Sequence, residues 1–401
     1  MKPKSLLVSK VSVALAVLSL VASGLTRSSR AVAAPTDNSR PSDGELVQVA
    51  EMSIARAAHT ATALPDGRVL VAGGFVEKGS AKGAEVYDSR AGRFSSLPPM
   101  ITTRHSHTAT LLHDGRVLIV GGYGDGTATL ATAEIFDPAT NSFASTGSLL
   151  AARAGHVAVL LQNGKVLVAG GVGPGWDFLS SAELFDPATG RFSTTGSMTV
   201  ARESHVGVRL VDGRVLIVGG HRGRRADITL YASAEMYDPA SGVFSRAGDM
   251  RVRRHKHDAV LLPDGHVLVT AGSDERDDRG VHDSSELFDP ATGAFTAGPT
   301  MQLGRYKHAG SSVLLPSGLV LIAGGAPQAE TYDARNHRFS LVGGVARMAG
   351  QFSAVAQLSD GNVLITGGYG NGGGPRSSAW LYRLPAPTTP RAPPRVAGDR
   401  R

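Results

Sequence analysis

One nine-residue segment that occurs in seven similar copies constrains this chain more than any other feature. Its first copy is Asp66-Gly-Arg-Val-Leu-Val-Ala-Gly-Gly74, and the copies follow one another at intervals of 43 to 53 residues. The turn glycines of the copies are Gly67, Gly115, Gly164, Gly213, Gly265, Gly318 and Gly361. A repeat of this length is typical of a four-stranded propeller blade. We therefore predict an all-β fold, a seven-bladed β-propeller.

Each copy reads as four strands joined by turns. In the second copy a small-residue strand, 107–112, meets the turn Asp114-Gly115, whose glycine supplies the positive φ of a tight hairpin. The strand 116–120 that follows is apolar on both faces, which suits a strand covered by neighbouring sheets. A third strand, 133–137, ends in an Asp-Pro-Ala-Thr turn, and a fourth surrounds Phe143.

The seventh copy lacks an outer strand of its own, because the chain becomes proline-rich after Tyr382. The missing strand is present at the other end, where residues 45–52 precede Arg56 as residues 93–100 precede Arg104. We therefore predict that the N-terminal segment supplies the outer strand of the last blade and closes the ring over residues 45–384, which removes an exposed sheet edge.

The two ends of the chain read differently from the repeats. Residues 1–33 hold a basic start, an apolar stretch and the small-residue site Ala31-Val32-Ala33, which predicts a signal peptide and a secreted or periplasmic protein. An uncleaved membrane anchor is the alternative for this segment. Residues 34–44 are expected to be a linker, and the Pro- and Arg-rich residues 385–401 a disordered tail. The chain has no cysteine, which excludes a cysteine-linked lipid anchor.

The formal net charge of +7 belongs to these ends. Residues 1–33 and 385–401 carry the excess of lysine and arginine, so the repeats are close to neutral. A neutral body gives no electrostatic case for nucleic acid as a partner. We expect no membrane association after signal cleavage, and a monomer.

Function is most often carried by variable loops on a rigid scaffold, and here the loops between strands two and three vary most. Those of blades three to five hold aromatic and charged side chains suited to a protein or glycan ligand. The candidate binding residues are Trp176, Asp177, Phe178, His221, Arg222, Arg224, Asp274 and Asp277. Plain solvated loops are the alternative. Calcium binding by the Asp274 cluster stays open, although the cluster lacks a fixed ligand spacing.

A second pattern, Arg-x-x-His, precedes six of the first strands, and a glutamate recurs in six of the third strands. Residues repeated in every blade are best explained by a structural need common to all blades. We expect each repeat arginine to pair with a repeat glutamate at a blade interface. The structural candidates include Arg104, His107, Glu134, Arg153, His156 and Glu183. A metal site near the pairs His105/His107 and His255/His257 is a third hypothesis.

The double glycine, the aromatic-Asp pair and the Arg-x-x-His motif together resemble bacterial Kelch repeats of the galactose oxidase type, over residues 45–384. The resemblance implies a copper site of two tyrosines and two histidines, with one tyrosine crosslinked to a cysteine. Arg305-Tyr306-Lys307-His308 is the nearest match to the family's R-x-Y-H stretch, but Lys307 stands at the tyrosine position and no cysteine exists. Radical copper oxidation is therefore not expected.

The leading hypothesis is an exported, non-catalytic Kelch propeller that binds a protein or glycan through the loops between strands two and three. No nucleophile elbow, zinc-helix or phosphate-loop motif is present. The alternatives are a carbohydrate-active enzyme with loop carboxylates and a degenerate galactose oxidase-like protein. No catalytic residue or cofactor is assigned, and calcium and copper stay open.

Overall fold

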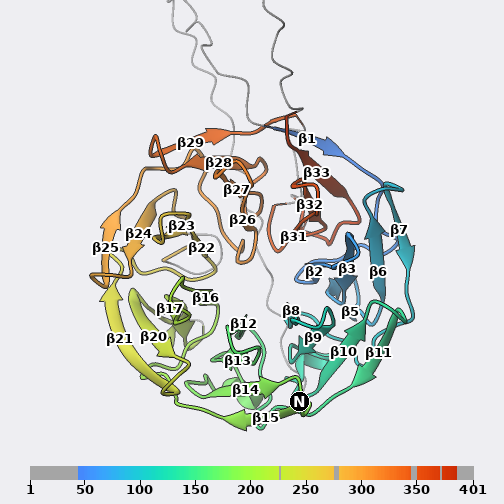
Figure 1. Cartoon of the computed structure of the whole chain (residues 1–401), viewed down its shortest axis with the longest axis horizontal. Coiled ribbons are helices and arrows are strands. Elements are labelled where there is room, and N and C mark those ends of the chain that lie inside the picture. Colours follow the sequence, from blue (N-terminus) through green and yellow to red (C-terminus); the bar gives the residue numbers. More distant parts are fainter. Residues whose placement is uncertain (1–43, 225–226, 275–279, 345–349, 371–372, 386–401) are drawn as a thin grey trace, which may run out of the picture. The chain divides into compact units, whose positions relative to one another are not determined.

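A computed structural model of the chain describes residues 44–224, 227–274, 280–344, 350–370 and 373–385, all within one compact unit, Pro41–Arg401. Seven antiparallel sheets follow one another around an axis, and each spreads from an inner strand to an outer one (Figure 1). This is the predicted seven-bladed propeller. In the described residues we find no helix of the length and apolar character that crossing a membrane takes.

The first strand of each blade lies closest to the axis (Figure 1). Its side chains are partly buried, and neighbouring inner strands contact one another around the ring. The inner strands are β2 (Thr60–Ala63), β8 (Thr108–Leu111), β12 (Val157–Leu160), β16 (Val206–Arg209), β22 (Asp258–Leu261), β26 (Ser312–Leu314) and β31 (Ala354–Gln357).

Apart from Arg68 at the start of β3, the second strands are fully buried, as their largely apolar sequences predict. They are β3 (Arg68–Ala72), β9 (Val117–Val120), β13 (Val166–Ala169), β17 (Val215–Val218), β23 (Val267–Thr270), β27 (Val320–Ile322) and β32 (Val363–Thr366). The third strands pair with them, and six of the seven carry a repeat glutamate. They are β6 (Ala84–Asp88), β10 (Ala133–Asp137), β14 (Ala182–Asp186), β20 (Ser233–Asp238), β24 (Ser285–Asp289), β28 (Glu330–Asp333) and β33 (Ala379–Arg383).

The outer strands are the most exposed. Six of them are β7 (Arg93–Ser96), β11 (Ser142–Ser145), β15 (Arg191–Thr194), β21 (Val243–Asp249), β25 (Ala294–Ala297) and β29 (Arg338–Leu341). The seventh is β1 (Glu45–Gln48), which pairs antiparallel with β33, so that Leu46 lies opposite Tyr382. The predicted closure of the ring by the N-terminal strand is therefore confirmed. A short strand, β30 (Gly343–Gly344), lies parallel on the other side of β1.

The hydrophobic core is divided among the gaps between blades. One buried cluster, for example, joins Leu70 and Val86 of the first blade to Val117, Ile119 and Phe136 of the second. Apolar side chains on both faces of each second strand fill the gaps on its two sides, which explains why those strands do not alternate in polarity.

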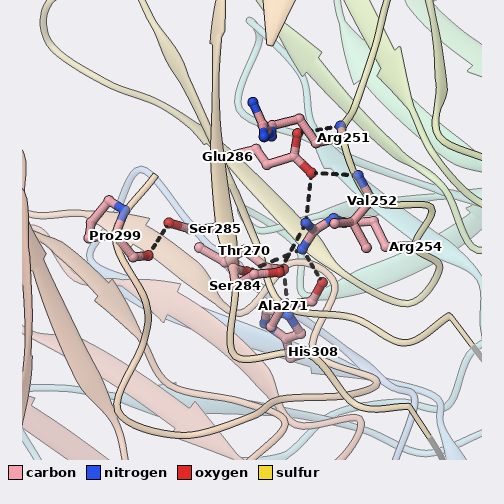
Figure 2. Close-up of polar contacts among 10 residues, drawn as sticks. All are labelled: Arg251, Val252, Arg254, Thr270, Ala271, Ser284, Ser285, Glu286, Pro299 and His308. Atoms are coloured by element: carbon pink, nitrogen blue, oxygen red, sulfur yellow. Dashed lines mark hydrogen bonds and ion pairs between the residues drawn. The ribbon is translucent and has the colours of Figure 1, made fainter. Parts of the chain in front are cut away.

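The repeat arginine and glutamate form a buried ion pair in each of the six described blades that carry them, with N–O distances of 2.7 to 3.0 Å. Figure 2 shows the pair of the fifth blade: Glu286 accepts hydrogen bonds from Arg254 and from the backbone N–H groups of Arg251 and Val252. Arg254 also donates to the carbonyl groups of Ala271 and Ser284.

The position of this pair differs in one respect from the expectation. Arg254 and Glu286 belong to the same repeat, so the pair does not join two blades through its side chains. It fixes the connection that enters a blade onto that blade's own third strand. Contact with the preceding blade comes from the arginine backbone, since the N–H of Gly220 donates to the carbonyl of Arg254.

Several repeat histidines make polar contacts with the preceding blade. His107 and His156 each lie within hydrogen-bonding distance of a threonine of the preceding inner strand, Thr60 and Thr108. In Figure 2 His308 reaches the carbonyl oxygen of Thr270 in the preceding blade. Burial lowers the pKa of these histidines, and that of His156 falls to about 3.

Candidate functional site

The two middle positions of the Arg-x-x-His motif lie near the axis, just before the start of each inner strand. The chain enters each inner strand there, and each second strand ends at the same face because the two strands are antiparallel. Isolated bridges join the two segments in most blades, for example His105 to Tyr123 and Glu203 to His221. We call this face, where the loops between strands two and three emerge, the mouth.

A circle of backbone hydrogen bonds surrounds the axis at the mouth. In six blades the backbone N–H of the second middle position donates to the carbonyl of the equivalent residue in the preceding blade, with N–O distances of 2.8 to 3.3 Å. Between the fifth and sixth blades the N–H of His308 donates to the carbonyl of Lys256 instead, at 3.4 Å. The members of this axial belt are Ala58, Ser106, Gly155, Ser204, Lys256, Lys307 and Phe352. All of them have left-handed φ angles between 50° and 62°. Only one member is glycine, so the tertiary structure holds six side-chain-bearing residues in an unfavourable backbone region.

Aromatic rings follow one another around the mouth, with centroids 4.9 to 6.2 Å apart. One series of contacts runs through Phe352, Tyr369, Phe75, His105, Tyr123 and Trp176. A second runs through Phe178, His221, His255 and Tyr306. We call the two series the mouth rings. The mouth rings come from all seven blades. The two series adjoin at the third blade, because Trp176 and Phe178 come from the same loop of that blade.

Trp176 is the most exposed of the mouth rings, at 38%. It ends the short 3-10 turn η2 (Pro174–Trp176) with a left-handed φ of 68°, an uncommon conformation for so bulky a residue. The guanidinium of Arg224, from the next blade's loop, lies 3.3 Å from the centroid of the indole. Two loops of neighbouring blades therefore meet over this ring.

Glu203 and His221 form the polar centre of the fourth blade's part of the mouth. Their Oε2 and Nε2 atoms are 3.5 Å apart. Burial raises the pKa of Glu203 to about 7, although Lys256 and Arg224 nearby oppose the shift. Burial also lowers the pKa of His221 to about 3, so this pair is not an ion pair with a charged histidine at neutral pH.

Tyr306 is the meeting point of the fifth and sixth blades. Its hydroxyl lies 3.3 Å from the Nε2 of His255 and accepts a hydrogen bond from Lys256 Nζ at the same distance. Lys307 Nζ lies 4.9 Å from the centroid of the tyrosine ring and donates to Gln351. Burial lowers the pKa of His255 to about 2, which leaves the imidazole neutral.

The structure brings together four of the predicted binding residues, Trp176, Phe178, His221 and Arg224, at the mouth. His221 is buried and lies in the short strand β18 (His221–Arg222), which pairs with β19 (Thr229–Leu230).

Other predicted binding residues have different surroundings. Asp177 and Arg222 are exposed, and the backbone N–H of Asp274 donates to Gly280. Asp277 lies outside the described residues. Two short elements of these loops complete the secondary structure: a hairpin of β4 (Phe75–Val76) with β5 (Gly79–Ser80), and the 3-10 turn η1 (Asp125–Thr127).

The paired histidines of the metal hypothesis lie in different environments. His105 and His255 contact mouth rings, whereas His107 and His257 are buried beside the double glycines of the preceding blades. Within the described ranges, no three side chains of histidine, aspartate or glutamate are grouped as metal ligands. His308, in the stretch nearest to R-x-Y-H, is buried with its Nε2 3.1 Å from the carbonyl oxygen of Thr270.

The sequence prediction missed several residues of the mouth: Tyr123, Glu203, Lys256, Tyr306 and Lys307. A signal for most of them was available. The outer positions of Arg-x-x-His stay constant in six repeats, while the middle positions read Ala-Ala, His-Ser, Ala-Gly, Glu-Ser, His-Lys and Tyr-Lys. Variation at fixed positions of a constant motif marks residues that the scaffold itself does not require.

Comparison with known proteins supports the fold. A model of the Kelch motif matches residues 56–101, 104–149, 153–199 and 204–251. No curated protein sequence matches the chain. Among solved structures, a fungal alcohol oxidase of the AA5 family, in complex with copper, matches with 20% identity and a TM-score of 0.55. The match covers 82% of this chain and 62% of the oxidase, and it supports the fold alone. The chain thus contains four Kelch motifs within a fold of seven propeller blades.

Proposed function

We propose that this propeller is an exported scaffold that binds a glycan at its mouth. The observation that carries the proposal is the succession of mouth rings around the axis, which all seven blades contribute. Support for export comes from residues 1–33, whose basic start, apolar stretch and small-residue site are those of a signal peptide.

Aromatic rings at a binding face suit a sugar, because the C–H face of a pyranose stacks on an aromatic face while its hydroxyl groups bond to polar neighbours. The mouth offers both kinds of group. Phe75, Tyr123 and Tyr369 are only partly buried, and so are the polar side chains of Glu203 and Gln351. A rigid aromatic surface also costs little conformational entropy when a ligand binds.

The test is the binding of purified protein to a panel of soluble polysaccharides, by affinity electrophoresis and calorimetry. Trp176→Ala is expected to weaken the binding roughly tenfold or more, as the loss of an aromatic anchor does, without lowering the melting temperature. Val211→Ala is the control, since it removes an exposed apolar side chain from a turn at the opposite face.

Two outcomes would contradict the proposal. One is that no polysaccharide of the panel is retained, which would favour a protein partner instead. The other is that Trp176→Ala binds as tightly as the unchanged chain. Release of reducing ends from a retained polysaccharide would favour the carbohydrate-active enzyme, for which Glu203, with its raised pKa, is the first carboxyl group to replace.

A further inference from the structure

The seven repeats provide an internal comparison for the charges of the mouth. In the first three blades the middle motif positions hold Ala57 and Ala58, His105 and Ser106, and Ala154 and Gly155. In the fifth and sixth blades the belt residue is Lys256 or Lys307. All these belt residues share the left-handed backbone conformation and the circular hydrogen bonding. The fold is therefore compatible with alanine, serine or glycine at this position and does not require lysine.

The two lysines converge although they come from different blades. Lys256 Nζ lies 5.4 Å from the centroid of the Tyr306 ring, and Lys307 Nζ lies 4.9 Å from it. Both ammonium groups therefore lie beside the same ring. An anionic group that reached both of them would gain a charge-assisted hydrogen bond from each, because an ammonium group has three N–H donors.

The aromatic surface continues directly beside these charges. Lys307 Nζ lies 5.5 Å from the centroid of Phe352, whose ring contacts Tyr369. On the other side, the field of Lys256 reaches Glu203 and His221, and that of Arg224 reaches Glu203 and Tyr123. Cations of the fourth, fifth and sixth blades thus border the rings on which a sugar would stack.

We propose that the mouth selects an anionic saccharide, whose carboxylate or sulfate group is held by Lys256 and Lys307 while its ring stacks on the neighbouring aromatic side chains. This inference rests on the proposed function and names its ligand class. The chemistry required of the ligand is a negative oxygen-rich substituent on a sugar ring, which a uronic acid and a sulfate ester both supply.

The experiment compares polymers that differ only in charge. One pair is polygalacturonate and its methyl ester, and the other is dextran sulfate and dextran, all at about 0.15 M salt to screen long-range attraction. Calorimetry is done with the unchanged chain and with Lys256→Ser and Lys307→Ser, which install the residue of Ser106 and Ser204. Lys165→Ser, in a turn at the opposite face, is the control for the loss of one positive charge.

We expect the anionic member of at least one pair to bind at least tenfold more tightly than its neutral partner. Each mouth lysine replacement should lower that affinity roughly tenfold, while Lys165→Ser leaves it unchanged. Preference confined to polygalacturonate would assign a uronic acid, and preference confined to dextran sulfate a sulfate ester.

Equal binding of charged and neutral partners would overturn the inference and leave the glycan site intact. The same holds if Lys165→Ser weakens binding as much as the mouth variants do, because the attraction would then be general. If no member of either pair binds, both the inference and the proposed function fail. Melting curves of both serine variants that match the unchanged chain confirm that folding is not the cause of any loss.

Discussion

The outer and middle positions of the Arg-x-x-His motif differ in what they contact, although they are adjacent in sequence. In the fourth blade Arg202 and His205 are buried, and the arginine makes an ion pair with Glu235. Glu203 and Ser204, between them, lie at the mouth. The outer positions are the same in six blades, whereas the middle positions change from blade to blade.

Under the proposed function, this difference separates the residues for stability from those for binding. Every blade must fix its incoming connection and pack on the preceding blade, so the residues for these tasks recur. The mouth is shared by all blades around one axis, and a ligand there needs different groups in different directions. A residue kept for function is commonly unfavourable for the stability of the fold. Glu203 is an example, because its raised pKa means that the folded chain disfavours its ionised form.

The largest expected effect comes from breaking a buried ion pair. Glu183→Ala leaves Arg153 buried without its carboxylate and removes the acceptor for the backbone N–H groups of Leu150 and Ala151. We expect the free energy of unfolding to fall by about 3–5 kcal/mol, as measured by urea denaturation. Glu203→Ala, the matched glutamate replacement at the mouth, is expected to leave stability unchanged or raise it. Equal losses in the two variants would refute the distinction between framework and mouth.

The next effect is a pH dependence that the buried histidines impose. His156 stays neutral in the folded chain because burial, helped by Arg153 and Arg104, lowers its pKa to about 3, whereas the unfolded chain binds a proton below about pH 6.5. Stability therefore falls as the pH falls below that value. Between pH 6.5 and 5 this histidine contributes a loss of about 2 kcal/mol.

His156→Gln removes this titration and keeps an amide near Thr108. Urea denaturation at pH 7 and pH 5 should show a smaller loss for the variant than for the unchanged chain. Glu203 acts in the opposite direction, because its pKa is raised in the folded chain, but it is common to both proteins and cancels in the difference. Identical losses would mean that His156 is protonated in the folded state.

The smallest effect concerns the backbone of the axial belt. Ala58→Gly removes the penalty of a left-handed φ of 50° and should raise the free energy of unfolding by about 0.5–1 kcal/mol. The reverse change, Gly155→Ala, should lower it, because the added Cβ would lie 2.6 Å from the Glu203 side chain. A stabilising Gly155→Ala would show that the belt conformation is not imposed by the ring.

The fold could be predicted almost completely from the sequence. Gly67 and its six equivalents fix the number of blades. The third strand of the seventh blade is not followed by an outer strand in the sequence, which implied the partner that β1 provides. Such features are local in sequence or repeat at a fixed interval. The pairing of Arg153 with Glu183 was also predictable, because two residue types of opposite charge recur together.

The mouth was predictable only in part, for a physical reason. Trp176 and Arg224 stand out as unusual loop residues, but their stacking depends on how two neighbouring blades approach each other. Tyr306 meets Lys256 from another blade, 50 residues away, and no local pattern encodes that distance. The motif also suggested a role for its constant histidines, which are structural. The variable residues between the constant arginine and histidine were overlooked.

The most direct test of the separation between framework and mouth is one combined variant, Glu203→Ala with Lys256→Ser and Lys307→Ser. Each replacement installs a residue that another blade already holds at the same motif position, as Ala57 and Ser106 do. The measurement is the melting temperature of this variant together with its affinity for the polysaccharide that the unchanged chain binds. We predict an unchanged or higher melting temperature and a loss of binding. A chain that melts at a markedly lower temperature, or that binds undiminished, would contradict the account.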